Sequence, residues 1–464
     1  MPETPWTGDI VSLVDAFRSG ERHPTEELAA TFAAVDASDL NAVCHIDADA
    51  AYESAAKADI SLPFGGVPLA GKELLAVAGW RAAEGSLPLA DRTFAEDSIS
   101  VRRLKGAGAV AAVQTTSSEF GGTNQTTTKI HGATRNPWNP DRTPGGSSGG
   151  SAAGVAGGIF TLATASDGGG SIRIPAGFCG LFGLKSTFGR IPRGPGIILG
   201  NATSVEGSVS RSVRDSARFL DVTNGFDLDD PKSLPRVEGF EEKLGTHTEE
   251  IRTLRVAVVP GLGCATVGPE SEELIRAAAE ELIAVTGMQR IDIDLRLPNI
   301  MGAWGLTGAV GTRKSLGDLW PDCGADITGA MRVGIERAEV SFNLSAMVKA
   351  ETRRVELNTA MAAMFANTDI VLAATNPATA FNAEGHLPST FEGVEARSSN
   401  NGALTAPSNI FGNPAAALPV GLASDGLPVS LQVLAPHYRE DLLLDLGRAW
   451  ERHRPWPLLA HLTN

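Results

Sequence analysis

Two glycine- and serine-rich segments constrain this 464-residue chain more than any other feature. The first, TPGGSSGGSAAGVAGG, spans residues 143–158, and the second, ASDGGGSIRIPAGFCG, spans 165–180. Glycine loses more conformational entropy on folding than any other residue, so a fold that keeps this many must need their backbone freedom. Successive N–H groups in such a loop can surround an anion, including one that exists only in a transition state. We therefore predict that Asp167–Ser171 combines an oxyanion site with a nucleophilic serine.

The composition predicts a folded protein with an acidic surface. Apolar residues make up 42% and charged residues 20% of the chain, which argues against disorder. The net charge of -15 and the lack of any basic run disfavour nucleic acid or an anionic membrane as a partner. Because no secretory-type N-terminus and no apolar stretch of 18 residues is present, we expect a cytoplasmic protein.

The four cysteines, Cys44, Cys179, Cys264 and Cys323, lie far apart in the sequence and form no C-x-x-C pair. This spacing is typical of reduced, buried thiols rather than of disulfides or a zinc site. We expect no metal and no cofactor.

Hydrophobic periodicity predicts alternating helices and strands. A buried strand is expected within residues 64–79, with Lys72 in its middle or at its end. The other expected elements are packing helices within 8–58, a helix from 97 followed by a strand at 110–113, a helix of small residues leading into a strand before the second glycine segment, a surface loop at about 225–253, a strand at 254–260, a helix at 269–287, strands within 368–375 and 427–435, and a helix at 439–453.

A serine nucleophile needs a base, and the sequence offers a lysine for that task. The histidines are scattered and none lies in a motif typical of a base; His131, near the glycine segments, is interpreted as structural. Lys72 stands in an apolar, glycine-lined strand of a chain with only nine lysines. Burial lowers the pKa of a lysine, so a buried Lys72 could accept the serine proton.

The chain resembles the amidase signature hydrolases over most of its length. The stretches that carry the resemblance are GGVPLAGKELL, SSEFGGTNQTT, GATRNPWNPDRTPGGSSGGSAAGVAGG, ASDGGGSIRIPAGFCGLFGLKSTFGR, GSVSRSVRDSARFLDV and NIFGNPAAALPVGLASDGLPVSLQVLAP. Length alone predicts two or three domains. The resemblance instead implies one α/β domain over residues 1–464, with a mixed, twisted central sheet covered by helices on both faces. Within it we expect N-terminal helices at about 8–58, the signature core at about 64–222 and a variable substrate-side region at about 290–400.

The resemblance also implies the catalytic residues. Ser171 would be the nucleophile, Ser147 would relay its proton through a hydroxyl oriented by a cis peptide with Gly146, and Lys72 would be the final acceptor. The backbone N–H groups of Gly168, Gly169, Gly170 and Ser171 would form the oxyanion hole, with Ser148, Asp167 and Arg173 in supporting roles. In the usual pattern the lysine is followed by Asp and a polar residue, but here Glu73 and Leu74 follow Lys72, and Gly71 precedes it.

The resemblance implies an amidase that hydrolyses a C–N bond through an acyl-enzyme. Because residues 290–400 are not rich in charge clusters, we expect an uncharged amide of small or medium size as its substrate. Anilides, nylon-type oligomers, carbamates and esters would all fit this mechanism. Residues 301–311, with Trp304, and residues 391–409 are predicted walls of the substrate pocket. A homodimer is common among relatives, although the sequence itself carries no sign of the oligomeric state.

Two other interpretations stay open. Gly145, Ser147 and Gly149 also match G-x-S-x-G, the nucleophile elbow of an α/β-hydrolase-type esterase that would use Ser147, but a proline-rich segment stands where the elbow needs a strand. The resembled family also contains the glutaminase chain of tRNA-dependent amidotransferases, which works within a complex.

Overall fold

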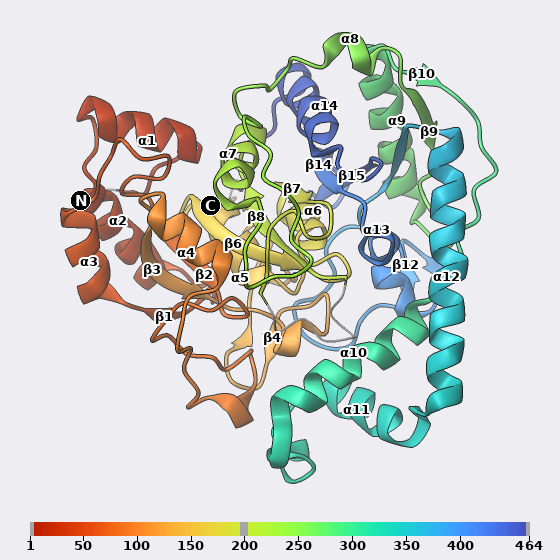
Figure 1. Cartoon of the computed structure of the whole chain (residues 1–464), viewed down its shortest axis with the longest axis horizontal. Coiled ribbons are helices and arrows are strands. Elements are labelled where there is room, and N and C mark those ends of the chain that lie inside the picture. Colours follow the sequence, from red (N-terminus) through yellow and green to blue (C-terminus); the bar gives the residue numbers. More distant parts are fainter. Residues whose placement is uncertain (1–3, 195–202, 461–464) are drawn as a thin grey trace.

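The computed structural model describes residues 4–194 and 203–460. Within them, eleven strands form one mixed sheet, in the order β1-β3-β2-β6-β8-β7-β14-β15-β11-β9-β10 (Figure 1). Their bounds, in chain order, are β1 Val43–Ile46, β2 Pro68–Lys72, β3 Val110–Thr115, β6 Leu162–Asp167, β7 Phe182–Lys185, β8 Val205–Ser210, β9 Arg255–Val258, β10 Gln289–Arg290, β11 Ile370–Ala374, β14 Ala415–Leu422 and β15 Pro428–Leu434. Two short hairpins, β4 Thr127–Thr128 with β5 Gly132–Ala133 and β12 Thr390–Phe391 with β13 Val394–Glu395, stand apart from it.

Helices cover both faces of the sheet, and two hydrophobic cores lie between the sheet and these helices. One core takes side chains from α1, α4, α7, α9, α12 and α14, and the other from α2, α3, α5 and α6. The helices are α1 Ile10–Ser19, α2 Pro24–Ala37, α3 Ala48–Ala56, α4 Ile99–Gly106, α5 Gly149–Ala156, α6 Arg173–Cys179, α7 Val213–Thr223, α8 Thr248–Ile251, α9 Pro269–Thr286, α10 Met301–Leu316, α11 Gly329–Ser341, α12 Leu344–Asn367, α13 Ala406–Phe411 and α14 Glu440–His453. The expected α/β class and mixed sheet are therefore confirmed.

Local sequence explains where several elements begin and end. Helix α9 starts with Pro269, which needs no N–H there, and ends at Gly287, whose φ of 74° would strain another residue. Helix α5 consists of small residues because its neighbours approach closely. A Cβ added to Gly154 would lie 2.0 Å from the ring of Phe160, and one on Gly150 would lie 2.5 Å from the carbonyl oxygen of Ala42.

Most predicted elements are found, but five of the eleven strands of the sheet were not predicted. The strand ending at Lys72, the helix at 269–287 and the helix at 439–453 are confirmed as β2, α9 and α14. The region 8–58 holds β1 as well as three helices, because the half-exposed VCHI segment pairs with β3 and shows too little alternation to be seen beforehand. Strands β7, β8, β10 and β14 were also not predicted. None of the described helices combines the length and apolarity needed to span a bilayer.

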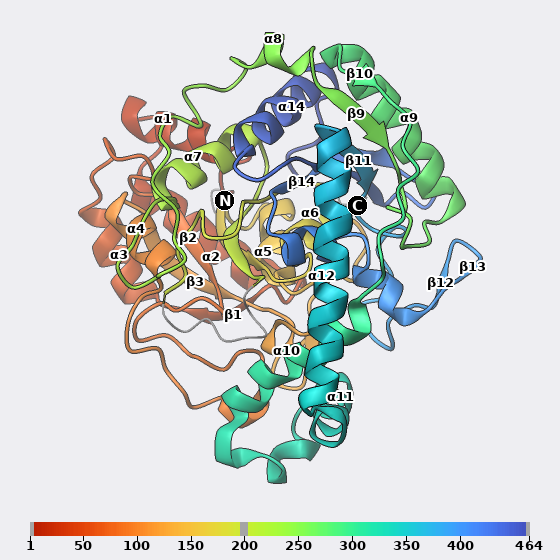
Figure 2. The same cartoon turned by 45° about the vertical axis from the view of Figure 1, so that its right-hand side comes forward.

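The sheet brings two distant chain segments to one edge. Strands β2 and β6 run parallel, with Leu69 opposite Leu162, so Lys72 and Ser166 both lie at their carboxyl ends. The carboxyl edge of parallel strands is the usual place for a binding crevice in α/β folds. Helices α10, α11 and α12 project on the opposite side of the molecule from α1–α3, and α12 stands upright along that side (Figures 1 and 2).

Candidate active site

The side chain of Lys72 lies at the centre of a cluster of serine hydroxyls. Its Nζ is 2.8 Å from Ser147 Oγ, 2.8 Å from Ser148 Oγ and 2.9 Å from Ser166 Oγ. Its backbone N–H donates to Thr164 Oγ1 on β6 at 2.8 Å. Lys72 is fully buried, and no carboxylate forms an ion pair with it among the described residues. The amine is thus held by neutral oxygens alone.

Burial lowers the pKa of Lys72 from 10.5 to about 7. Desolvation of the ammonium form is the largest cause, and the charges of Asp167 and Glu73 partly oppose it. An amine with this pKa is substantially neutral at physiological pH, so it can accept a proton through Ser147.

The first glycine segment presents Ser147 to the lysine. The Gly146–Ser147 peptide is cis, and Gly145 has a φ of 88°, which glycine adopts readily. A Cβ on Gly146 would lie 2.8 Å from the carbonyl oxygen of Thr123, so the backbone here has no room for a side chain. No named strand lies within residues 134–146, so the strand that a nucleophile elbow at Ser147 requires is missing from this described segment.

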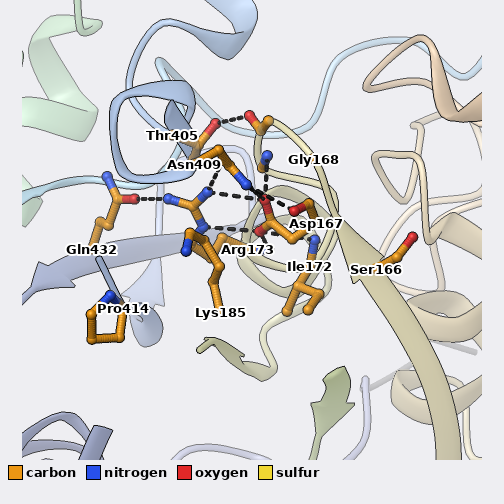
Figure 3. A network of polar contacts seen from close by, with 12 residues as sticks. Ser166, Asp167, Gly168, Ile172, Arg173, Lys185, Thr405, Asn409, Pro414 and Gln432 are labelled. Atoms are coloured by element: carbon orange, nitrogen blue, oxygen red, sulfur yellow. Dashed lines mark hydrogen bonds and ion pairs between the residues drawn. The ribbon is translucent and has the colours of Figure 1, made fainter. Parts of the chain in front are cut away.

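The second glycine segment is anchored by a buried ion pair between Asp167 and Arg173 (Figure 3). Both Arg173 Nε and Nη2 lie 3.0 Å from the carboxylate. Burial alone would raise the pKa of Asp167, but the charge and hydrogen bonds of Arg173 hold it at about 2. The network is completed by Gly170 N–H and Asn409 Nδ2 donating to Asp167, and by Arg173 donating to Asn409 Oδ1 and Gln432 Oε1.

The four carbonyl groups of residues 167–170 are all bound, which fixes the direction of the loop's peptides. Thr405 Oγ1 donates to the Gly169 carbonyl at 2.6 Å, and a Cβ on Gly170 would lie 2.3 Å from the same hydroxyl. The other three carbonyls, of Asp167, Gly168 and Gly170, accept from Asn409 Nδ2, Thr203 Oγ1 and Ile174 N–H, respectively.

Of the four N–H groups of residues 168–171, one is hydrogen-bonded and three are free within the described residues. Because C=O and N–H point to opposite sides of a trans peptide, the bound carbonyls turn the N–H groups of Gly168, Gly169 and Ser171 away from their anchors. Within the described residues these three N–H groups have no hydrogen-bond partner, whereas that of Gly170 donates to Asp167 at 2.6 Å. The loop thus offers several free donors beside a partly exposed Ser171.

Both predicted pocket walls reach this loop. Thr405, from the 391–409 segment, holds the Gly169 carbonyl, and a Cβ on Gly169 would lie 2.7 Å from the ring of Trp304 on α10. Near the first glycine segment, Leu74 lies close to Gly121, which itself approaches Ser147 Oγ.

The residues that depart from the usual pattern next to Lys72 have structural partners. Glu73 accepts from Ser117 N–H at 2.7 Å and lies 3.0 Å from His131 Nε2, and Trp80 packs against Gly71. The ligand atoms of Cys44, Glu73 and His131 lie within 4.8 Å of one another and could hold a metal ion. Burial raises the pKa of the Cys44 thiol, which disfavours the thiolate that a metal needs, and hydrogen bonds already account for the arrangement.

Some of the residues that build the site around Lys72 and Asp167 were not predicted from the sequence. Ser166 immediately precedes the Asp-Gly-Gly-Gly run, and its position next to Asp167 was the available signal. Asn409 ends the predicted 391–409 wall but was given no role, and Gln432 had no signal. The four cysteines are all unpaired, but Cys44 and Cys264 are only partly buried.

Comparison with known proteins identifies the family. A family model described as Amidase matches residues 25–444. The chain belongs to the amidase family. This amidase is 30% identical to an acylamidase of Rhodococcus erythropolis over 94% of both chains. It is also 30% identical to a glutamyl-tRNA(Gln) amidotransferase subunit from Akkermansia muciniphila, over 95% of this chain and 98% of that one.

A solved structure of a bacterial aryl acylamidase of the amidase signature family superposes with a TM-score of 0.89. It is 29% identical, and the match covers 97% of each chain. The resemblance found in the sequence is thereby confirmed, and the chain is a hydrolase of amide C–N bonds.

Proposed function

We propose that this amidase cleaves small, uncharged amides through an acyl-enzyme on Ser171, with Ser147 and Lys72 as a proton relay. The contact between Lys72 Nζ and Ser147 Oγ carries the proposal, because it joins a buried amine of lowered pKa to a hydroxyl. Asp167 and Arg173 fix the conformation of the loop that carries Ser171. Ser148 and Ser166 hold the amine of Lys72 in position. No metal or cofactor has a part in this scheme.

In acylation, Ser171 Oγ forms a bond to the amide carbon while its proton passes to Ser147, whose own proton passes to neutral Lys72. The tetrahedral intermediate then breaks its C–N bond, and the proton returns through Ser147 to the leaving amine. Water repeats the sequence on the ester and releases the acid. Carbamates and esters would react by the same steps.

The oxyanion would be bound by the free N–H groups of Gly168, Gly169 and Ser171. The N–H group of Gly170, which the sequence included in the hole, is engaged by Asp167 and is better assigned to holding the loop. Donors fixed in advance cost no reorganisation when the charge develops, which is why such sites accelerate acyl transfer.

An anilide-like substrate is favoured over glutamine. Trp304 and Thr405 lie against the nucleophile loop, and neither supplies a charge for an α-carboxylate or α-ammonium group. The similarity to an acylamidase also favours an anilide-like substrate over glutamine. These two observations support aryl or alkyl amides without charged groups.

Labelling with a fluorophosphonate tests the assignment of the nucleophile. We expect a single adduct on Ser171, located by peptide mass spectrometry, and a loss of labelling in Lys72→Ala because the relay has no proton acceptor. An adduct on Ser147 instead would move the nucleophile to the elbow and contradict the proposal.

The activity should depend on the protonation of Lys72. Because the relay needs the neutral amine and burial lowers its pKa to about 7, kcat/KM should rise about tenfold per pH unit below pH 7 and level off above it. The pKa of buried Lys185 is also lowered to about 7, so a Lys185→Met variant is the matched control and should keep the inflection. A pH profile that is flat between pH 5.5 and 8, with folding intact, would exclude Lys72 as the base.

The second candidate is a role as the glutaminase chain of an amidotransferase, which the similarity to the Akkermansia muciniphila protein supports. The isolated chain should then be inactive on anilides and release ammonia from glutamine only with its partners. Steady turnover of a neutral anilide by the purified chain, without partner or ATP, distinguishes the two.

A further inference from the structure

The indole N–H of Trp304 is a buried hydrogen-bond donor that has no partner among the described residues. The chain has seven tryptophans, all within the described residues. The other six donate their indole N–H to an oxygen: those of Trp6, Trp80, Trp138, Trp320, Trp450 and Trp456 bind Ser12, Asp47, Cys179, Glu339, Pro419 and Arg211, respectively. A buried donor without a partner costs about 1–3 kcal/mol, so proteins rarely keep one without a use.

The indole N–H of Trp304 belongs to a ring that packs on the glycine loop of the candidate active site. Trp304 lies in the first turn of α10, and its six-membered ring packs on Gly169, within 2.7 Å of where a Cβ would stand. Gly169 is the middle of the loop between Asp167 and Ser171, and its N–H is one of the three free donors. A substrate carbonyl bound there therefore places its substituents beside the indole.

Within residues 4–194 and 203–460, no group accepts a hydrogen bond from this indole N–H. The carbonyl of Gly169, the residue on which the indole packs, already accepts from Thr405. The carbonyl oxygen of Trp304 itself accepts from Thr307. The side chain as a whole is only partly buried, so a ligand seated on the loop can reach the ring.

We propose that Trp304 donates its indole N–H to a second hydrogen-bond acceptor of the substrate, an ether or carbonyl oxygen a few bonds from the scissile carbonyl. The preferred substrates are then neutral amides that carry such an oxygen, rather than purely hydrocarbon amides. This inference rests on the proposed function for the placing of the scissile carbonyl, and it adds a specificity residue to that site.

The experiment uses pairs of ligands that differ only in oxygen for CH₂. Methoxyacetanilide and butyranilide place the change on the acyl side, and N-(2-methoxyethyl)benzamide and N-butylbenzamide place it on the amine side. Dissociation constants are measured by equilibrium dialysis on Ser171→Ala, which cannot turn the ligands over, and on Ser171→Ala/Trp304→Phe. Phenylalanine at position 304 keeps a flat aromatic surface but lacks the N–H donor. Ser171→Ala/Trp456→Phe is the matched control, because the indole of Trp456 binds Arg211 elsewhere.

We expect at least one ether ligand to bind about 3- to 10-fold more tightly than its hydrocarbon isostere, as one hydrogen bond provides. The preference should vanish in Trp304→Phe and persist in Trp456→Phe. Equal binding within both pairs, failure of all four ligands to bind, or a preference that survives in Trp304→Phe would overturn the inference.

Turnover of the same amides by the unmodified chain separates this inference from the proposed function. If the chain hydrolyses the anilides without any effect of Trp304, the function stands and the inference fails. If it hydrolyses none of them, yet Ser171→Ala shows the Trp304-dependent preference, the site binds such ligands and the proposed reaction is wrong.

Discussion

Replacing Ser171 with alanine should lower kcat on a neutral anilide by about 10⁴-fold or more, because the acyl-enzyme can no longer form. The fold should be unaffected: Ser171 is partly exposed, and its side chain forms no hydrogen bond within the described residues. The measurement is single-turnover anilide hydrolysis, with circular dichroism and the melting temperature as checks on folding.

Ser204 provides a matched control close to the same loop. Its side chain lies near Gly168, where an added Cβ would be 3.5 Å from its hydroxyl, and it has no part in the relay. Ser204→Ala should therefore retain kcat within about threefold, well under the loss expected from removing the nucleophile. A Ser171→Ala enzyme that keeps most of its activity while Ser147→Ala is inactive would show that Ser147 is the nucleophile.

Replacing Asp167 with alanine should have the largest effect on stability. It leaves the fully buried guanidinium of Arg173 without its counter-charge, and breaking a buried pair in this way costs about 3–5 kcal/mol of unfolding free energy. The substitution also removes the carboxylate that accepts hydrogen bonds from the Gly170 N–H and from Asn409 Nδ2. The loop at residues 167–171 should therefore lose its conformation, and the enzyme its activity. Guanidinium denaturation followed by tryptophan fluorescence measures the change.

Two comparisons make that result specific. The double variant Asp167→Ala/Arg173→Met removes both charges and should be less destabilised than the sum of the single variants. Glu53→Gln breaks the exposed pair with Lys57, in which both side chains are 71% exposed, and should leave the free energy of unfolding nearly unchanged. Strictly additive losses at Asp167 and Arg173 would contradict the coupling that the geometry implies.

The same pair contributes to the dependence of stability on acid pH. The pKa of Asp167 is held at about 2 in the folded state and lies near 4 in an unfolded chain, so the folded state prefers the ionised form. The stabilisation is complete above about pH 4 and declines as the pH falls through 2.

The locally encoded parts of the candidate site could be predicted from the sequence. The apolar, glycine-bounded stretch around Lys72 indicated a buried strand, and β2 ends at that lysine. The two glycine segments indicated tight loops with free N–H groups, and the motif matches extended this to the α/β fold and to Ser147 and Ser171. These properties depend on neighbouring residues, so a sequence carries them directly.

Tertiary structure alone decided what lies against those elements. The sequence placed Trp304 in a pocket wall, but its packing on Gly169, far away along the chain, could not be predicted from either segment. The placing of Ser166 beside Lys72 depends on the register of β2 with β6, and the engagement of the Gly170 N–H by Asp167 depends on the path of one loop. Contacts of this kind arise when helices and strands pack, because side-chain shape across the core, rather than local propensity, then fixes which groups meet.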